Sequence, residues 1–103
     1  MRLSFDVDGV LDTPKGFEAA KRAISRGDDV YIITARNERF SAEVYELAKQ
    51  LGIPRLRVYF TNGADKWQTV KRLRIERHYD NNQEQLDKIR ENTNAKAEKV
   101  LNT

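Results

Sequence analysis

The chain has 103 residues, which suits one folded domain with a single core. It contains no cysteine and one histidine, which excludes disulfides, a thiol nucleophile and thiolate metal sites, and argues against a histidine-based zinc cluster. No apolar run reaches the roughly 18 residues of a membrane span, and the sequence from Met1 onward lacks the features of a signal peptide, so we expect a cytoplasmic protein with no membrane contact.

The net charge of +3 is spread unevenly along the chain. Residues 1–48 carry seven basic and nine acidic side chains, residues 49–77 carry eight and two, and residues 78–103 carry four and five. The basic middle block favours an anionic partner such as a nucleic acid. The same block is equally explained as a solvated set of surface charges, so both interpretations stay open.

The first half of the chain alternates between strand-like and helix-like segments. Residues 3–5 predict a short strand, and residues 17–26 have helical spacing of apolar side chains before Gly27, a natural helix end. Residues 30–33 form a continuous apolar run that is typical of a buried parallel strand. Residues 41–51 carry a single apolar stripe and predict a second helix.

The second half continues this alternation. The predicted elements are strands at 56–60 and 75–79 and helices at 66–73 and 83–91. In the tail, Val100 and Leu101 fit either a fifth, edge strand or a last helical turn. Strands that alternate with helices indicate βαβ units with right-handed crossovers. We therefore predict an α/β protein, a Rossmann-like three-layer sandwich with a central parallel sheet of four to five strands, as one domain over 1–103.

Polar side chains follow each predicted strand, and the carboxyl ends of parallel strands meet at one edge of the sheet. They are Asp6 and Asp8 after the first strand, Thr34 after the second, Asn62 and Lys66 after the third, and Asp80 and Asn81 after the fourth. Three carboxylates at one edge repel one another unless a cation lies among them. Mg²⁺ prefers oxygen ligands and bridges to substrate phosphate, so we expect a magnesium site here.

This set of side chains suits phosphoryl transfer. Asp6 is the candidate nucleophile toward phosphorus, and Asp8 can protonate the leaving oxygen and then activate water. Thr34 and Lys66 can bind the phosphoryl oxygens, where charge must be neutralised. Arg36 follows Thr34 closely and is a candidate substrate contact.

Asn62, after the third strand, is a second candidate for substrate binding. The single histidine, His78, lies in an alternating strand, and we expect it to be a surface or partly buried side chain without a catalytic role.

Four segments resemble the motifs of the haloacid dehalogenase (HAD) superfamily of phosphohydrolases, in the family's order. They are LSFDVDGVL at 3–11, IITAR at 32–36, Lys66 at the start of a helix after the Asn62-Gly63 loop, and HYDNN at 78–82. The resemblance implies a Rossmann-like fold, a covalent phospho-Asp6, and Mg²⁺ held by the Asp6 carboxylate, the Asp8 backbone carbonyl and Asp80. One position departs from the pattern: Asn81 stands where many members have a second acidic residue. An asparagine can still orient a metal-bound water, with lower metal affinity.

Family members often carry a cap domain over the site, and this chain leaves no room for one. Few residues separate Leu11 from the first helix, and only one helix and one strand lie between Thr34 and Lys66. An open site suits a large substrate that supplies its own cover, such as a nucleic-acid end or a phosphoprotein, or a homo-oligomer that provides the lid.

The sequence thus predicts a Mg²⁺-dependent phosphatase that hydrolyses phosphate monoesters through an aspartyl-phosphate, with nucleotides or nucleic-acid ends favoured by the basic block. A small-molecule phosphatase that forms oligomers is a second hypothesis. A non-catalytic or weakly active binding module with the same fold is the alternative from another class, and Asn81 is the feature that favours it. A response-receiver domain ranks last, because its phospho-acceptor would follow the third strand, where this chain has Thr61-Asn62-Gly63.

Overall fold

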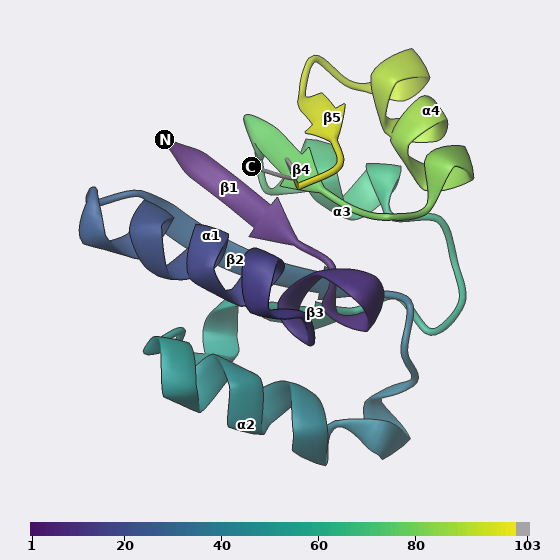
Figure 1. The fold of residues 1–103 in the computed structure, drawn as a ribbon. Helices are drawn as coiled ribbons and strands as arrows, with labels where there is room; N and C mark the ends of the chain where they lie inside the picture. The colour runs from purple at the N-terminus through teal and green to yellow at the C-terminus, as the bar shows by residue number, and fades with distance from the viewer. Residues whose placement is uncertain (101–103) are drawn as a thin grey trace.

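Five parallel strands form one sheet at the centre of the computed structural model, which describes residues 1–100 (Figure 1). The strands are β1 (Arg2–Phe5), β2 (Asp29–Thr34), β3 (Val58–Phe60), β4 (Arg77–Tyr79) and β5 (Lys96–Glu98). Their spatial order is β3-β2-β1-β4-β5. Leu3 of the central strand lies opposite Val30 on one side and opposite Arg77 on the other, and every pairing is parallel.

Helices cover both faces of this sheet. They are α1 (Pro14–Ser25), α2 (Ala42–Leu51), α3 (Trp67–Arg72) and α4 (Gln83–Asn92), joined by the short turns η1 (Val7–Leu11), η2 (Glu38–Phe40) and η3 (Arg55–Arg57). The α1 and α2 helices pack on one face, and α3 and α4 pack on the other (Figure 1). This arrangement confirms the predicted α/β fold of the Rossmann-like type. Among residues 1–100, no helix combines the length and apolar character that crossing a membrane requires.

The order of the strands creates a crevice beside β1. The chain builds outward from β1 through β2 to β3, and then returns to place β4 on the other side of β1 and β5 beyond it. In open parallel sheets, ligands bind outside the carboxyl ends of the strands at such a change of direction. The residues that follow β1 and β4 therefore lie at the expected binding position.

The two faces of the sheet bury different side chains, because alternate residues of a strand point to opposite faces. On the α1 and α2 side, Leu3 and Phe5 of β1 belong to the core, both at most 2% exposed. On the α3 and α4 side, Ile33 packs with Leu86 and Ile89. The apolar run in β2 thus supplies both layers, as expected of a strand buried on two sides.

Helix α1 starts earlier than the predicted residue 17. Thr13 is its N-cap, with the hydroxyl oxygen accepting a hydrogen bond from the Gly16 amide at 3.2 Å, and Pro14 occupies the first helical position. Both are standard helix-start signals. Gly16 lies where α1 passes the backbone of η1, and a β-carbon added there would be 1.9 Å from the Val10 carbonyl oxygen.

Three predicted strand positions are corrected by the structure. Strand β3 begins at Val58, because the turn after Pro54 forms η3 and leaves Leu56 87% exposed. Strand β4 begins at Arg77, two residues later than predicted. The fifth strand is Lys96–Glu98, so neither alternative for Val100 applies, since this residue lies outside any strand or helix and packs against the α1 and α2 core. Leu101 lies outside the described residues.

Substitution of Gly16 by alanine tests the close approach of α1 to η1. Because the obstructing atom belongs to the backbone, Gly16→Ala must push the two elements apart, and we expect unfolding by urea to show a loss of about 1–3 kcal/mol. Lys21→Ala, an exposed change on the same helix, is the control and should stay within about 0.5 kcal/mol of wild type. Equal stability of all three proteins would contradict the tight contact.

Candidate functional site

Asp6 is fixed at the carboxyl end of the central strand. Its backbone is extended, and its amide donates a hydrogen bond to the Tyr79 carbonyl of β4 at 3.0 Å. Its side chain is nearly buried, and Oδ1 lies 3.0 Å from the Nζ atom of Lys66. The sheet therefore holds this carboxylate in the crevice between β1 and β4.

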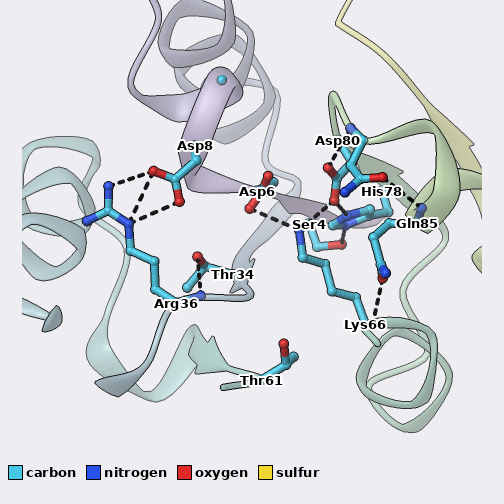
Figure 2. A network of polar contacts seen from close by, with 12 residues as sticks. Ser4, Asp6, Asp8, Thr34, Arg36, Thr61, Lys66, His78, Asp80 and Gln85 are labelled. Atoms are coloured by element: carbon cyan, nitrogen blue, oxygen red, sulfur yellow. Dashed lines mark hydrogen bonds and ion pairs between the residues drawn. The ribbon is translucent and has the colours of Figure 1, made fainter. Parts of the chain in front are cut away.

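Lys66 connects two carboxylates that are far apart in the sequence. It precedes α3 directly, and its backbone amide donates to the Gln85 side chain of α4 at 3.0 Å. Its ammonium group is 2.6 Å from Oδ2 of Asp80 and also contacts Asp6, so that it lies between the two acidic groups (Figure 2). The lysine is 2% exposed, which makes this a buried ion triad.

Asp80, directly after β4, is held by donors on both of its oxygens. Oδ1 accepts a hydrogen bond from the Asn82 amide at 3.0 Å. Oδ2 accepts from Lys66 and lies 3.0 Å from Nε2 of His78. The residue has no exposed surface, so these protein donors replace the water that a carboxylate normally requires.

The two carboxylates differ in their pKa values because their partners differ. Burial raises the pKa of Asp6 to about 6, the neighbouring charge of Asp80 adds to the rise, and Lys66 offsets part of it. Burial also opposes ionisation of Asp80, but the His78 hydrogen bond and the Lys66 charge outweigh it and hold its pKa below the usual range. Asp6 is therefore mostly ionised at neutral pH, and its partners offset the effect of burial less than the partners of Asp80 do.

Asp8 forms its ion pair with Arg36 and not with Lys66. It lies in η1 with a non-helical backbone, and its carboxylate is 57% exposed. Arg36 binds it with two parallel hydrogen bonds, Nε to Oδ2 at 3.0 Å and Nη2 to Oδ1 at 2.7 Å (Figure 2). Arg36 also pairs with Glu43 at 2.7 Å. These bonds hold the pKa of Asp8 below its ordinary value.

The sequence predicted that three carboxylates would lie at this edge, and the structure shows how each is paired: Asp6 and Asp80 share the Lys66 ammonium, and Asp8 pairs with the Arg36 guanidinium. The physical reason is electrostatic, because Asp8 would add a like charge to two buried carboxylates that share a single ammonium group. The partly buried Arg36 instead offers Asp8 a matched pair of donors in the usual fork geometry.

Thr34 is the last residue of β2 and is fully buried. Its hydroxyl oxygen accepts a hydrogen bond from the Arg36 backbone amide at 3.2 Å. In Figure 2 it lies at the same edge as Asp6, between the side chains of Arg36 and Lys66. The predicted phosphate-binding hydroxyl is thus at the site edge.

The two asparagines named from the sequence lie apart from the ion triad. Asn62 is exposed in the turn after β3, with φ of 54°, and its side chain forms no hydrogen bond within residues 1–100. Asn81 lies over η1: a β-carbon on Gly9 would be 2.1 Å from its side-chain nitrogen. Gly9 also has φ of 79°, so the turn requires glycine there for two reasons.

This centre offers two carboxylates as possible ligands for Mg²⁺. Within residues 1–100, no group of three or more acidic, histidine or cysteine side chains is arranged to hold a metal ion. Asp6 and Asp80 with the single ammonium group carry a net charge of minus one, which favours a cation. Mg²⁺ commonly takes one or two carboxylates and completes its coordination with waters and substrate phosphate. Asp6 and Asp80 are the two buried carboxylates at this edge that could serve as ligands to such an ion.

Sequence reasoning missed His78 and Ser4. His78 is fully buried and lies 2.6 Å, through Nδ1, from the Ser4 hydroxyl, in addition to its contact with Asp80. A signal was present: Ser4 and His78 each precede a strand-end aspartate by two residues, and in a strand that spacing places both side chains on one face.

Two hollows on the described surface differ in their relation to this centre. One of about 490 Å³ lies between η1, the start of α1 and the Asp80-Asn81 segment, and adjoins the ion triad. A larger one, about 740 Å³, lies at the opposite edge of the sheet, between the ends of α3 and α4. Of these two hollows, the smaller one is lined by a member of the ion triad, Asp80, and the larger one is not.

The fold and the site together define an α/β protein with a buried carboxylate–ammonium–carboxylate centre at the carboxyl end of its central strand. Comparison of the chain with protein-family models, curated proteins and solved structures found no match. The case for a function therefore depends on the residues themselves and their geometry.

Proposed function

We propose that the chain is a Mg²⁺-dependent phosphatase of the HAD superfamily that hydrolyses phosphate monoesters through Asp6. The observation that carries this proposal is the ion triad, in which Lys66 joins the buried Asp6 at the end of β1 to Asp80 at the end of β4. The four motif-like segments of the sequence support the family assignment, and the fold is of the type that the resemblance implies.

In the first half of the reaction, a carboxylate oxygen of Asp6 attacks phosphorus. The new bond joins this oxygen to phosphorus, and the bond from phosphorus to the ester oxygen breaks. With a pKa of about 6, Asp6 is largely in the ionised, nucleophilic form at neutral pH. The leaving oxygen takes a proton from Asp8.

In the second half, water attacks the phosphorus of the acyl phosphate, gives its proton to Asp8, and the bond from phosphorus to Asp6 breaks. For Asp8 to act in this way, its paired hydrogen bonds with Arg36 must be exchanged for contacts with substrate, because in that pair the pKa of Asp8 is lowered and the group is a poor acid. A substrate phosphate offers Arg36 the same fork geometry as the carboxylate does. Substrate binding and release of Asp8 are thus the same event in this proposal.

The transferring phosphoryl group would be bound by the Thr34 hydroxyl and the Lys66 ammonium, which neutralise charge on its oxygens. Asp6, Asp80 and the backbone carbonyl of Asp8 would hold Mg²⁺. When bound, the ion supplies positive charge that screens the phosphate from the two buried carboxylates.

The charged surface of the protein bears on the substrate class. The basic block at 49–77 favours nucleotides or nucleic-acid ends, but three of its arginines stack on tyrosine rings of the protein. These pairs are Arg55 with Tyr45 at 4.2 Å, Arg57 with Tyr31 at 5.4 Å, and Arg72 with Tyr59 at 5.8 Å. Part of the block thus has a packing role, which leaves a small phosphate ester as the competing substrate.

A second candidate function is a binding module without turnover. It is favoured by the Asp8–Arg36 pair, which engages the proposed acid. Such a module would bind phosphorylated ligands in the presence of Mg²⁺ and leave them intact.

A phosphatase assay separates these two functions. With a generic aryl phosphate, we expect phosphate release that requires Mg²⁺ and stops when EDTA is added. Mg²⁺-dependent binding of a phosphate ester with no release would instead support the binding module. A panel of 3′- and 5′-phosphorylated oligonucleotides and mononucleotides then tests the substrate class, and equal indifference to all of them would favour a small phosphate ester.

A further inference from the structure

A chain of buried polar contacts runs from the interior of the sheet to the ion triad. The Ser4 hydroxyl is 2.6 Å from Nδ1 of His78, and Nε2 of His78 is 3.0 Å from Oδ2 of Asp80 (Figure 2). That same oxygen of Asp80 binds the Lys66 ammonium at 2.6 Å. All four side chains are at most 2% exposed, so water plays no part in these bonds.

The donor and acceptor groups of Ser4, His78 and Asp80 determine where the protons lie in this series of hydrogen bonds. Asp80 is ionised and accepts only, so Nε2 of His78 must carry a proton. With its proton on Nε2, a neutral imidazole accepts a hydrogen bond at Nδ1, where the Ser4 hydroxyl lies. The Ser4 hydroxyl therefore donates to Nδ1, and each group has its partner.

Packing alone does not explain this pair. Ser4 and His78 lie opposite each other in adjacent strands, on the face where the neighbouring core residues are apolar. Burying two polar side chains there costs free energy that apolar residues would not cost, even when the hydrogen bonds are made. The pair must therefore do something that an apolar pair would not do.

We propose that Ser4 and His78 are positioning residues that hold the Asp80 carboxylate at the angle from which it binds the phosphate-binding lysine. The imidazole fixes one lone pair of Oδ2, and the ammonium group takes another, which sets the place of the lysine beside Asp6. This inference rests on the phosphatase function proposed above and adds two residues that do not touch substrate.

The geometry of Oδ2 shows what His78 contributes. Oδ1 is fixed by a backbone amide, and Oδ2 is fixed by two side chains. Without the imidazole, the carboxylate keeps its charge but loses the partner that opposes the pull of Lys66, so the ammonium can shift from its place next to Asp6. The effect should be larger in the chemical step, where charge on the phosphoryl oxygens must be neutralised, than in substrate binding.

Kinetics of two His78 variants test this role. His78→Leu removes the donor, and we expect kcat to fall by about 10- to 100-fold with KM little changed, the usual range for losing a partner of a site ligand. His78→Gln keeps an N–H donor at a similar reach and should restore kcat to within a few-fold of wild type. Ile89→Val, a buried change on the same side of the sheet, is the control and should leave kcat unchanged. Equal loss in the leucine and glutamine variants, or no loss in either, would overturn the proposal.

Nuclear magnetic resonance of the wild-type protein provides a test that needs no activity. Because the chain has one histidine, long-range proton–nitrogen correlations report its tautomer without ambiguity. We expect the proton on Nε2 and slow exchange of that proton with solvent, and a proton on Nδ1 alone would overturn the positioning role even if the leucine variant failed to fold. An inactive wild type with the Nε2 tautomer would instead disprove the phosphatase function while the hydrogen-bond chain stood.

Discussion

Asp6→Asn should abolish phosphate release, with kcat lower by a factor on the order of 10⁴ or more, as for the loss of other nucleophiles. The amide keeps the size of the side chain but cannot form a stable bond to phosphorus. The measurement is the Mg²⁺-dependent aryl phosphate assay. Asp87→Asn makes the same chemical change at an exposed position of α4 and should retain full activity. Substantial turnover by Asp6→Asn would remove Asp6 from the role of nucleophile.

The same substitution should change how stability depends on pH. The pKa of Asp6 is raised from its ordinary value to about 6, so the stability it contributes is complete below about pH 4 and is lost as the pH rises through 6. The amide that replaces this carboxyl group cannot ionise and avoids the loss. The variant should therefore gain on wild type between pH 4 and 7, by about 3 kcal/mol at most. A difference in unfolding free energy that does not change with pH would contradict the raised pKa.

Lys66→Met should destabilise the protein and eliminate activity together. Removing one partner of a buried ion pair typically costs about 3–5 kcal/mol, because it leaves an uncompensated charge, and here it leaves two carboxylates facing each other. Such a loss is a large part of the stability of a small domain. Thermal unfolding with the activity assay provides the measurement.

The pH dependence of this variant gives it a distinctive signature. Lys66 lowers the pKa of both Asp6 and Asp80, so its removal raises both. A raised carboxyl pKa contributes stability that is present at low pH and lost as the pH rises. Lys66→Met should therefore be closest to wild type near pH 4 to 5 and furthest from it near pH 8. Lys71→Met, an exposed change on α3, is the control and should follow the wild-type curve.

The fold was largely predictable because its signals are local. The continuous apolar run at 30–33 indicated a strand buried on two faces, and Gly52, which has φ of 78°, ended the second helix as expected. The errors lie where local signals conflict. Leu56 has strand propensity, but the turn after Pro54 directs it to solvent. Strand β5 is only three residues long and contains two charged side chains, so its pattern is too short to recognise.

The candidate site was predictable in its location but not in its pairing. The strand-end rule placed Asp6, Thr34 and Asp80 at one edge, because it depends only on topology. The pairing of charged side chains depends on their burial and on the distances between them, and both are properties of the packed structure. The ion pair between Asp8 and Arg36 depends on this packing, and so does the burial of His78.

The position of β4 next to β1 has a consequence for synthesis of the chain on the ribosome. Strands β1, β2 and β3 can associate once residue 60 has emerged, but Asp80 reaches the central strand only after β4 does. Asp80 is thus absent from the site until residues 77–80 have emerged. A nascent chain in that interval holds Asp6 without its distant counterpart, so any reactivity of this carboxylate is postponed until β4 has paired with β1.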